Sequence, residues 1–150
     1  MDEEIGAPPS VWAIALLGLS GFPVAAMAYA YGPSSISGHG LNVLITWSAV
    51  MLGFLGGIRW GLESGRKAPP RWPRLALSAL FPIGGWTLLA ARGDIPVEWI
   101  LTGYIAAYIL QWLFDHSAPD TPSRYPRLMT VLTLGACVSL AMALEKALRM

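Results

Sequence analysis

Apolar residues fall in five long, nearly continuous stretches, and short segments rich in Gly, Pro and polar residues separate them. The stretches lack the period-two alternation of a membrane-barrel strand, so we expect helices. A helix needs roughly 20 apolar residues to cross a bilayer core about 30 Å thick, and each stretch is close to that length. The predicted spans are about 11–31, 41–62, 74–91, 96–114 and 128–147.

The connections between these stretches predict how the spans are arranged. The first, 32–40, is rich in Gly and Ser and is expected to be a turn-rich loop. The third, 92–95, is so short that the third and fourth spans should be adjacent and antiparallel. The second and fourth, 63–73 and 115–127, carry prolines and most of the loop charge.

Composition strengthens this interpretation. Of the 150 residues, 55% are hydrophobic and only 13% are charged, and the mean hydropathy is +0.53. A soluble domain usually carries about 25% charged residues, so a soluble globule, a disordered chain and a coiled coil are all disfavoured. Five spans leave too few residues for a separate folded domain. We therefore predict one all-α, polytopic membrane domain over residues 1–150, a bundle of five transmembrane helices.

Charge predicts the orientation of the chain. The acidic start, Met-Asp-Glu-Glu, has no positive n-region, which favours a bacterial inner-membrane protein that inserts through its first span. Seven basic residues fall on the side of the N-terminus: Arg59, Arg66, Lys67, Arg71, Arg74, Arg124 and Arg127. Three fall on the other: Arg92, Lys146 and Arg149. The positive-inside rule then places the N-terminus in the cytoplasm and the C-terminus in the periplasm.

Small residues at four-residue spacing predict helix-packing faces. Gly53, Gly57 and Gly61 recur on the second span, and Gly135 and Ser139 recur on the fifth. Such a face lets a partner backbone approach closely, either inside one bundle or between two copies of the chain.

Polar residues within the spans are the best pointers to function in a membrane protein. Tyr104, Tyr108 and Gln111 form a stripe on the fourth span that continues to Asp115. The stripe should face protein, where it would either bond to other helices or line a path for a solute. Kinks at prolines of the first and third spans would suit the second alternative.

Arg59 and Asp115 are predicted to form an ion pair. Each lies near the cytoplasmic end of its span, and similar short motifs, Arg-Trp-Gly-Leu-Glu and Gln-Trp-Leu-Phe-Asp, surround them. The alternatives for Arg59 are Glu63, one turn along the same helix, and a lipid phosphate.

The remaining chemistry is sparse. Arg66, Lys67, Arg71 and Arg74 could hold anionic lipid headgroups, although an ordinary positive-inside bias explains them equally well. We predict no cofactor and no metal site, since His39 and His116 fall on opposite sides of the membrane. A net charge of +1 gives no reason to expect nucleic acid as a partner.

Several segments resemble a known five-helix membrane family. They include Leu17 to Pro23, the stretch Phe-Leu-Gly-Gly-Ile-Arg-Trp-Gly over residues 54–61, and Ser78 to Trp86, followed by 111–115 and positions 122–133. This domain-of-unknown-function family also contains the mitochondrial transmembrane protein 69. The resemblance implies an energy-coupling membrane and an all-helical fold, and it supplies no activity.

Together these features predict a non-enzymatic accessory, assembly or scaffold protein of a membrane complex, in contact with the lipid bilayer. The alternative is a small transporter or channel that uses the kinked first and third spans and the polar face of the fourth.

Overall fold

The computed structural model describes residues 9–65, 72–116 and 126–149, and within these ranges the ordered elements are helices. They are α1 (Pro9–Leu19), α2 (Gly21–Tyr31), α3 (Ser34–Ser64), α4 (Trp72–Ala90), α5 (Val97–His116) and α6 (Pro126–Arg149).

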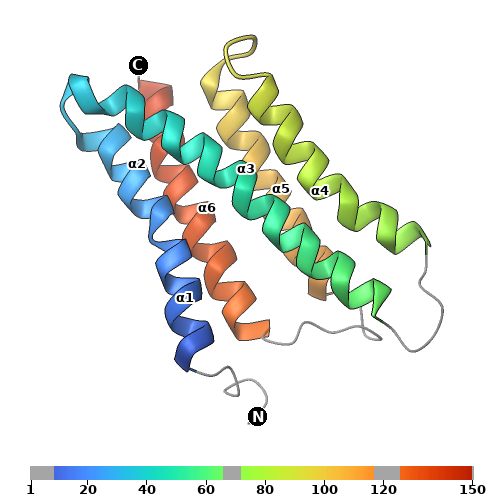
Figure 1. Ribbon diagram of the computed structural model, residues 1–150. Helices are drawn as coiled ribbons and strands as arrows, with labels where there is room; N and C mark the ends of the chain where they lie inside the picture. The colour runs from blue at the N-terminus through green and yellow to red at the C-terminus, as the bar shows by residue number, and fades with distance from the viewer. Residues whose placement is uncertain (1–8, 66–71, 117–125, 150) are drawn as a thin grey trace.

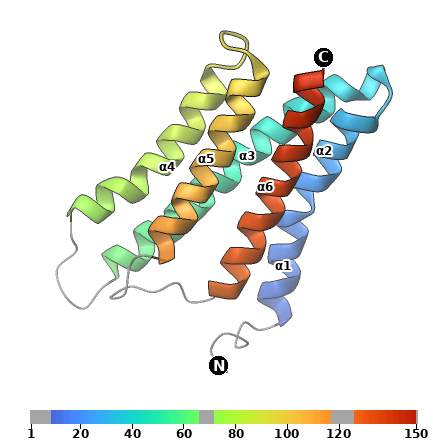
Figure 2. The same ribbon diagram turned by 180° about the vertical axis from the view of Figure 1, so that it is seen from behind.

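The helices form two groups, which are joined by α3 and by the packing of α5 against α6 (Figures 1 and 2). In one group, α1 and α2 run beside α6; in the other, α4 and α5 pack as an antiparallel pair. Helix α3 crosses between them, starting beside α2 and ending beside α4. One end of the bundle, here called the N-terminal end, therefore collects the starts of α1, α4 and α6 and the ends of α3 and α5 (Figure 1).

The first predicted span is two helices with a break at Ser20. Pro23 has no N–H to donate to the carbonyl of Leu19, four residues earlier, and α1 ends at that residue. The backbone continues in the same direction, because the N–H of Val24 still bonds to the carbonyl of Ser20 at 3.2 Å. The predicted kink is therefore present, slightly before the proline.

The first connection is much shorter than predicted, which corrects the expected loop over 32–40. Only Gly32 and Pro33 link α2 to α3, and Pro33 caps α3 with extended backbone at φ −61° and ψ 158°. The Ser- and Gly-rich segment after it is helical because it packs on α2. The hydroxyl of Ser37 donates to the carbonyl of Tyr29 at 2.8 Å. A Cβ on Gly40 would lie 2.7 Å from the Tyr29 nitrogen, so only glycine fits there.

The tight turn between α4 and α5 is confirmed. Gly93 has φ +97°, a left-handed conformation that favours glycine. The side chain of Arg92 donates to the amide oxygen of Asn42 at 2.6 Å, which ties this turn to α3.

Among the residues that the structure describes, four stretches are long and apolar enough to cross a membrane: Pro9–Tyr31, Ser34–Ser64, Val97–His116 and Arg127–Arg149. Helix α4 is not among them, although it was predicted as a span. Its 19 residues include Arg74, two prolines and two glycines, which dilute its hydrophobic residues.

Candidate functional site

The predicted partners Arg59 and Asp115 lie in contact at the N-terminal end of the bundle. Arg59 Nη1 is 2.8 Å from Asp115 Oδ1, and their side chains are 2% and 5% exposed. The same nitrogen donates to the backbone carbonyl of Asp115 at 2.9 Å. One guanidinium from α3 thus holds both a carboxylate and a terminal carbonyl of α5.

This geometry explains how the bundle tolerates a buried arginine. Burying a charge is costly unless it is paired and hydrogen-bonded. The last carbonyls of a helix have no partner within the helix and carry its partial negative charge, so a cation at the end of α5 is doubly favoured. The contact joins residues that are 56 positions apart in the sequence. Glu63, the alternative partner on α3, is also buried, with 2% of its surface exposed.

Trp112 and His116 of α5 link the neighbourhood of this ion pair to α6. The indole N–H of Trp112 donates to the hydroxyl of Thr130 at 3.0 Å. The ring centroids of Trp112 and His116 are 4.4 Å apart, and His116 Nδ1 is 3.9 Å from Asp115 Oδ2. The ends of α3 and α5 and the start of α6 are therefore connected by polar contacts.

The polar stripe of α5 faces the interior. Tyr104, Tyr108 and Gln111 are at most 4% exposed. The Tyr104 hydroxyl donates to the carbonyl of Gly85 on α4 at 2.9 Å, and the Tyr108 hydroxyl donates to the carbonyl of Ser48 on α3 at 2.7 Å. Each tyrosine therefore fastens α5 to a different neighbouring helix.

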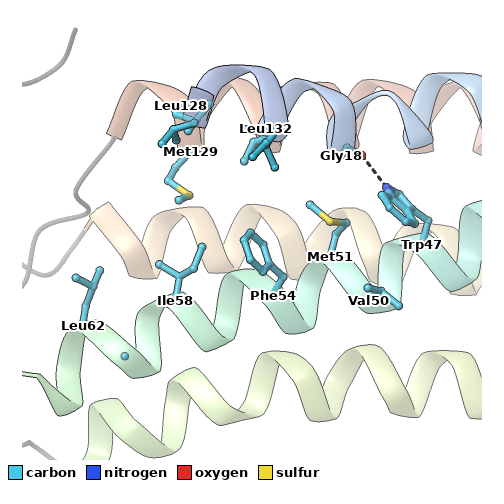
Figure 3. Close-up of a pocket in the computed structure, with 14 residues that line it drawn as sticks. Gly18, Trp47, Val50, Met51, Phe54, Ile58, Leu62, Leu128, Met129 and Leu132 are labelled. Atoms are coloured by element: carbon cyan, nitrogen blue, oxygen red, sulfur yellow. Dashed lines mark hydrogen bonds between the residues drawn. The ribbon is translucent and has the colours of Figure 1, made fainter. Parts of the chain in front are cut away.

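A long apolar groove opens between α1, α3 and α6 (Figure 3). It has a volume of about 670 Å³. Its walls are almost entirely hydrocarbon and thioether groups, among them Ile14, Phe54, Met51, Ile58 and Met129. At its inner end the Trp47 indole N–H donates to the carbonyl of Gly18 at 2.9 Å and joins the two walls (Figure 3).

A family model for proteins of unknown function, DUF3429, matches residues 7–145. The chain belongs to the DUF3429 family. No curated protein and no solved structure matches the chain.

The predicted glycine faces behave differently in this DUF3429 chain. A Cβ on Gly135 of α6 would lie 2.6 Å from a methyl of Leu19, and Ser139 is buried, so this face packs tightly. On α3, however, a Cβ on Gly57 or Gly61 would meet nothing within 4 Å, and on Gly53 it would only touch Pro82 at 4.0 Å. Within one copy of the chain this second face therefore meets no close neighbour at Gly57 or Gly61, and a contact between two copies stays a prediction.

The residue that sequence reasoning missed is Gly56. A Cβ there would lie 2.6 Å from Pro82 Cδ and 2.9 Å from the carbonyl oxygen of Ser78. Pro82 has no N–H to donate to the Ser78 carbonyl four residues before it, and this carbonyl oxygen lies on the side of α4 that faces Gly56. The geometry of the helix explains why the four-residue spacing did not identify Gly56. Positions four apart rotate by about 40° on a helix of 3.6 residues per turn, so Gly53, Gly57 and Gly61 run diagonally away from α4.

The predicted headgroup residues fall partly outside the described ranges, as Arg66, Lys67 and Arg71 do. The guanidinium of Arg74 lies 4.8 Å from the centre of the Phe114 ring, a cation–π contact between α4 and α5. Within the described residues no three His, Cys, Asp or Glu side chains gather as metal ligands would.

Proposed function

We propose that this protein is a non-catalytic accessory, assembly or scaffold component of a complex in the bacterial inner membrane. The observation that carries the proposal is that polar side chains of the bundle bond to neighbouring helices. Arg59, Tyr104, Tyr108 and Trp112 each bond across to another helix, so the groups that could handle a solute maintain the architecture instead.

The proposed arrangement has five spans, with α4 as the third. Nineteen helical residues extend about 28 Å, close to the bilayer core of about 30 Å. Helix α4 lies antiparallel to its neighbours α3 and α5 (Figure 1). The seven-to-three distribution of Lys and Arg supports a cytoplasmic N-terminus and a periplasmic C-terminus. The resemblance to the family of mitochondrial transmembrane protein 69 supports an energy-coupling membrane.

The topology is tested with a reporter that is active only in the cytoplasm. Fusions after Arg71 and Arg124 should be active, and a fusion after Met150 should be inactive. Activity of the Met150 fusion would mean that α4 does not cross or that the orientation is reversed.

The accessory role is tested by native electrophoresis of the tagged chain in mild detergent. We expect it to migrate in a complex larger than a dimer, and a tag on the co-migrating protein should recover this chain in return. Migration only as a monomer or homodimer would contradict the proposal.

The transporter alternative makes a different prediction. If the stripe on α5 were a pathway, proteoliposomes holding the protein should pass protons or small solutes. Tyr108→Phe, which removes one hydroxyl of the stripe, should then change the flux. Under our proposal, flux should equal that of empty vesicles for both wild type and variant.

A further inference from the structure

The groove between α1, α3 and α6 lies along only half of α3. On that helix its lining begins at Trp47 and ends at Leu62. Helix α3 runs from Ser34 to Ser64, so Trp47 stands near its middle. The indole bond to Gly18 closes the groove at this midpoint, and the other end reaches the helix ends at the N-terminal end of the bundle.

The length of the groove corresponds to one leaflet of a bilayer. Helix α3, with 31 residues, is about 46 Å long, and a tilt of about 40°, the upper end for membrane helices, leaves a depth of about 35 Å. Its ends therefore reach beyond a core of about 30 Å. The segment from 47 to 62 is about 22 Å long, and the same tilt reduces its depth to about 17 Å. That depth is roughly half of the core, so an occupant enters at the membrane surface and ends near the midplane.

The closed inner end of the groove argues against a membrane-spanning helix as occupant. Such a helix would need to continue past the midplane, where Trp47 and Gly18 close the groove.

We propose that this groove binds one acyl chain of a phospholipid from the leaflet at the N-terminal end of the bundle. The chain's methyl end lies against Trp47, and its phosphate lies at the level of Leu62 and the start of α6, where Arg127 is exposed. Met51 and Met129 suit this role, because their flexible thioethers adapt to an irregular, mobile chain. The second acyl chain remains in the bilayer.

The proposal is tested with photoactivatable phospholipids. The protein is reconstituted in phosphatidylethanolamine–phosphatidylglycerol vesicles containing a trace of phospholipid with a diazirine in one acyl chain, near either its methyl end or its glycerol end. We expect the methyl-end probe to label wild type near Trp47 and Met51, and the glycerol-end probe to label near Ile58 and Leu62. Labelling without this order along α3 would overturn the proposal.

Matched variants separate a bound chain from ordinary boundary lipid. Gly61 lines the groove and Gly57 does not, yet a Cβ at either position has open space. Gly61→Leu should fill part of the groove and lower labelling of the groove segment about ten-fold, whereas Gly57→Leu should leave it unchanged. Equal labelling in both variants would mean that boundary lipid alone contacts this surface.

A second pair approaches the groove from its other wall. Ala15 of α1 lines the groove, and Ala13 is an exposed position outside it. Ala15→Phe should lower the labelling and Ala13→Phe should not. This pair keeps the test decisive if Gly61→Leu fails to fold, and unaffected labelling in Ala15→Phe would count against the bound chain.

Discussion

The two faces of α3 differ in how closely they approach their neighbours. Toward α4, Gly56 meets Pro82 and the carbonyl of Ser78 with no room for a single carbon atom. Toward α1, the side chains of Phe54 and Ile58 border an open groove. Without a strong hydrophobic force between helices in lipid, close packing and polar contacts decide which faces join. The α4 face has the close packing, and the groove face is joined to α1 by the bond from Trp47 to Gly18.

The comparison shows how a proline on one helix and a glycine on the next allow the two backbones to approach closely. Pro82 removes the usual N–H donor of the Ser78 carbonyl on α4, and Gly56 lets the α3 backbone come near that carbonyl. On the groove side, large side chains keep the walls apart, and the break at Ser20 separates α1 from the better-packed α2. One helix can therefore be fixed on one side and leave room for a ligand on the other.

The largest expected effect comes from removing the ion pair that anchors α3 to α5. Arg59→Ala leaves the buried Asp115 carboxylate without its guanidinium, and breaking a buried pair in this way typically costs about 3–5 kcal/mol. We expect a large loss of thermal stability in detergent, measured by the temperature at which the protein precipitates. The double variant Arg59→Ala/Asp115→Ala should be less damaged than the sum of the single variants. Strict additivity would show that the two side chains stabilise the bundle independently.

A second prediction compares neighbouring residues on the two faces. Leu55 is 3% exposed within the core, and Phe54 is 56% exposed at the groove. Leu55→Ala should cost about 2 kcal/mol or more through lost contacts and the cavity left behind. Phe54→Ala removes a larger side chain, yet thermal unfolding in detergent should show a smaller loss. If Phe54→Ala proves the more damaging, the groove is a packed interface in solution.

The ion pair and the open face also show how far sequence reasoning reaches. Charged residues within a span are rare, so Arg59 and Asp115 could be paired from their common depth alone. The stripe of Tyr104 and Tyr108 likewise indicated a buried face. The groove could not be predicted, because in a membrane helix the residues facing lipid and those facing protein are both apolar, so periodicity does not separate them.

The close approaches between helices could not be predicted from the sequence either. The sequence contains Gly53, Gly56, Gly57 and Gly61, and only the angle between α3 and α4 decides which of them meets Pro82. The helical start of α3 was missed for a related reason. Ser and Gly have low intrinsic helix propensity, and packing against Tyr29 overrides it.

A third prediction concerns the close contact itself. Gly56→Leu places a side chain against Pro82 Cδ and the Ser78 carbonyl, neither of which is the flexible end of a side chain. Overpacking of this kind typically costs about 1–3 kcal/mol, so folded yield and thermal stability should fall. Gly57→Leu, one position further and facing open space, is the matched control and should be tolerated. Equal damage from both would show that loss of glycine, and not the approach of α4, is responsible.

The smallest expected effect tests whether the stripe on α5 belongs to the fixed side of the molecule. Tyr108→Phe keeps the ring, which packs edge-on against Phe22 with centroids 5.8 Å apart, and removes only the hydroxyl that donates to Ser48. Hydrogen bonds between helices in a membrane bundle contribute about 0.6 kcal/mol on average, so a fall in stability of that size should appear in thermal unfolding. Tyr31→Phe is the control, because Tyr31 is 67% exposed. If both variants unfold like wild type, the Tyr108 hydroxyl contributes no net stability, and the packing of α5 on α3 rests on its rings and on Arg59.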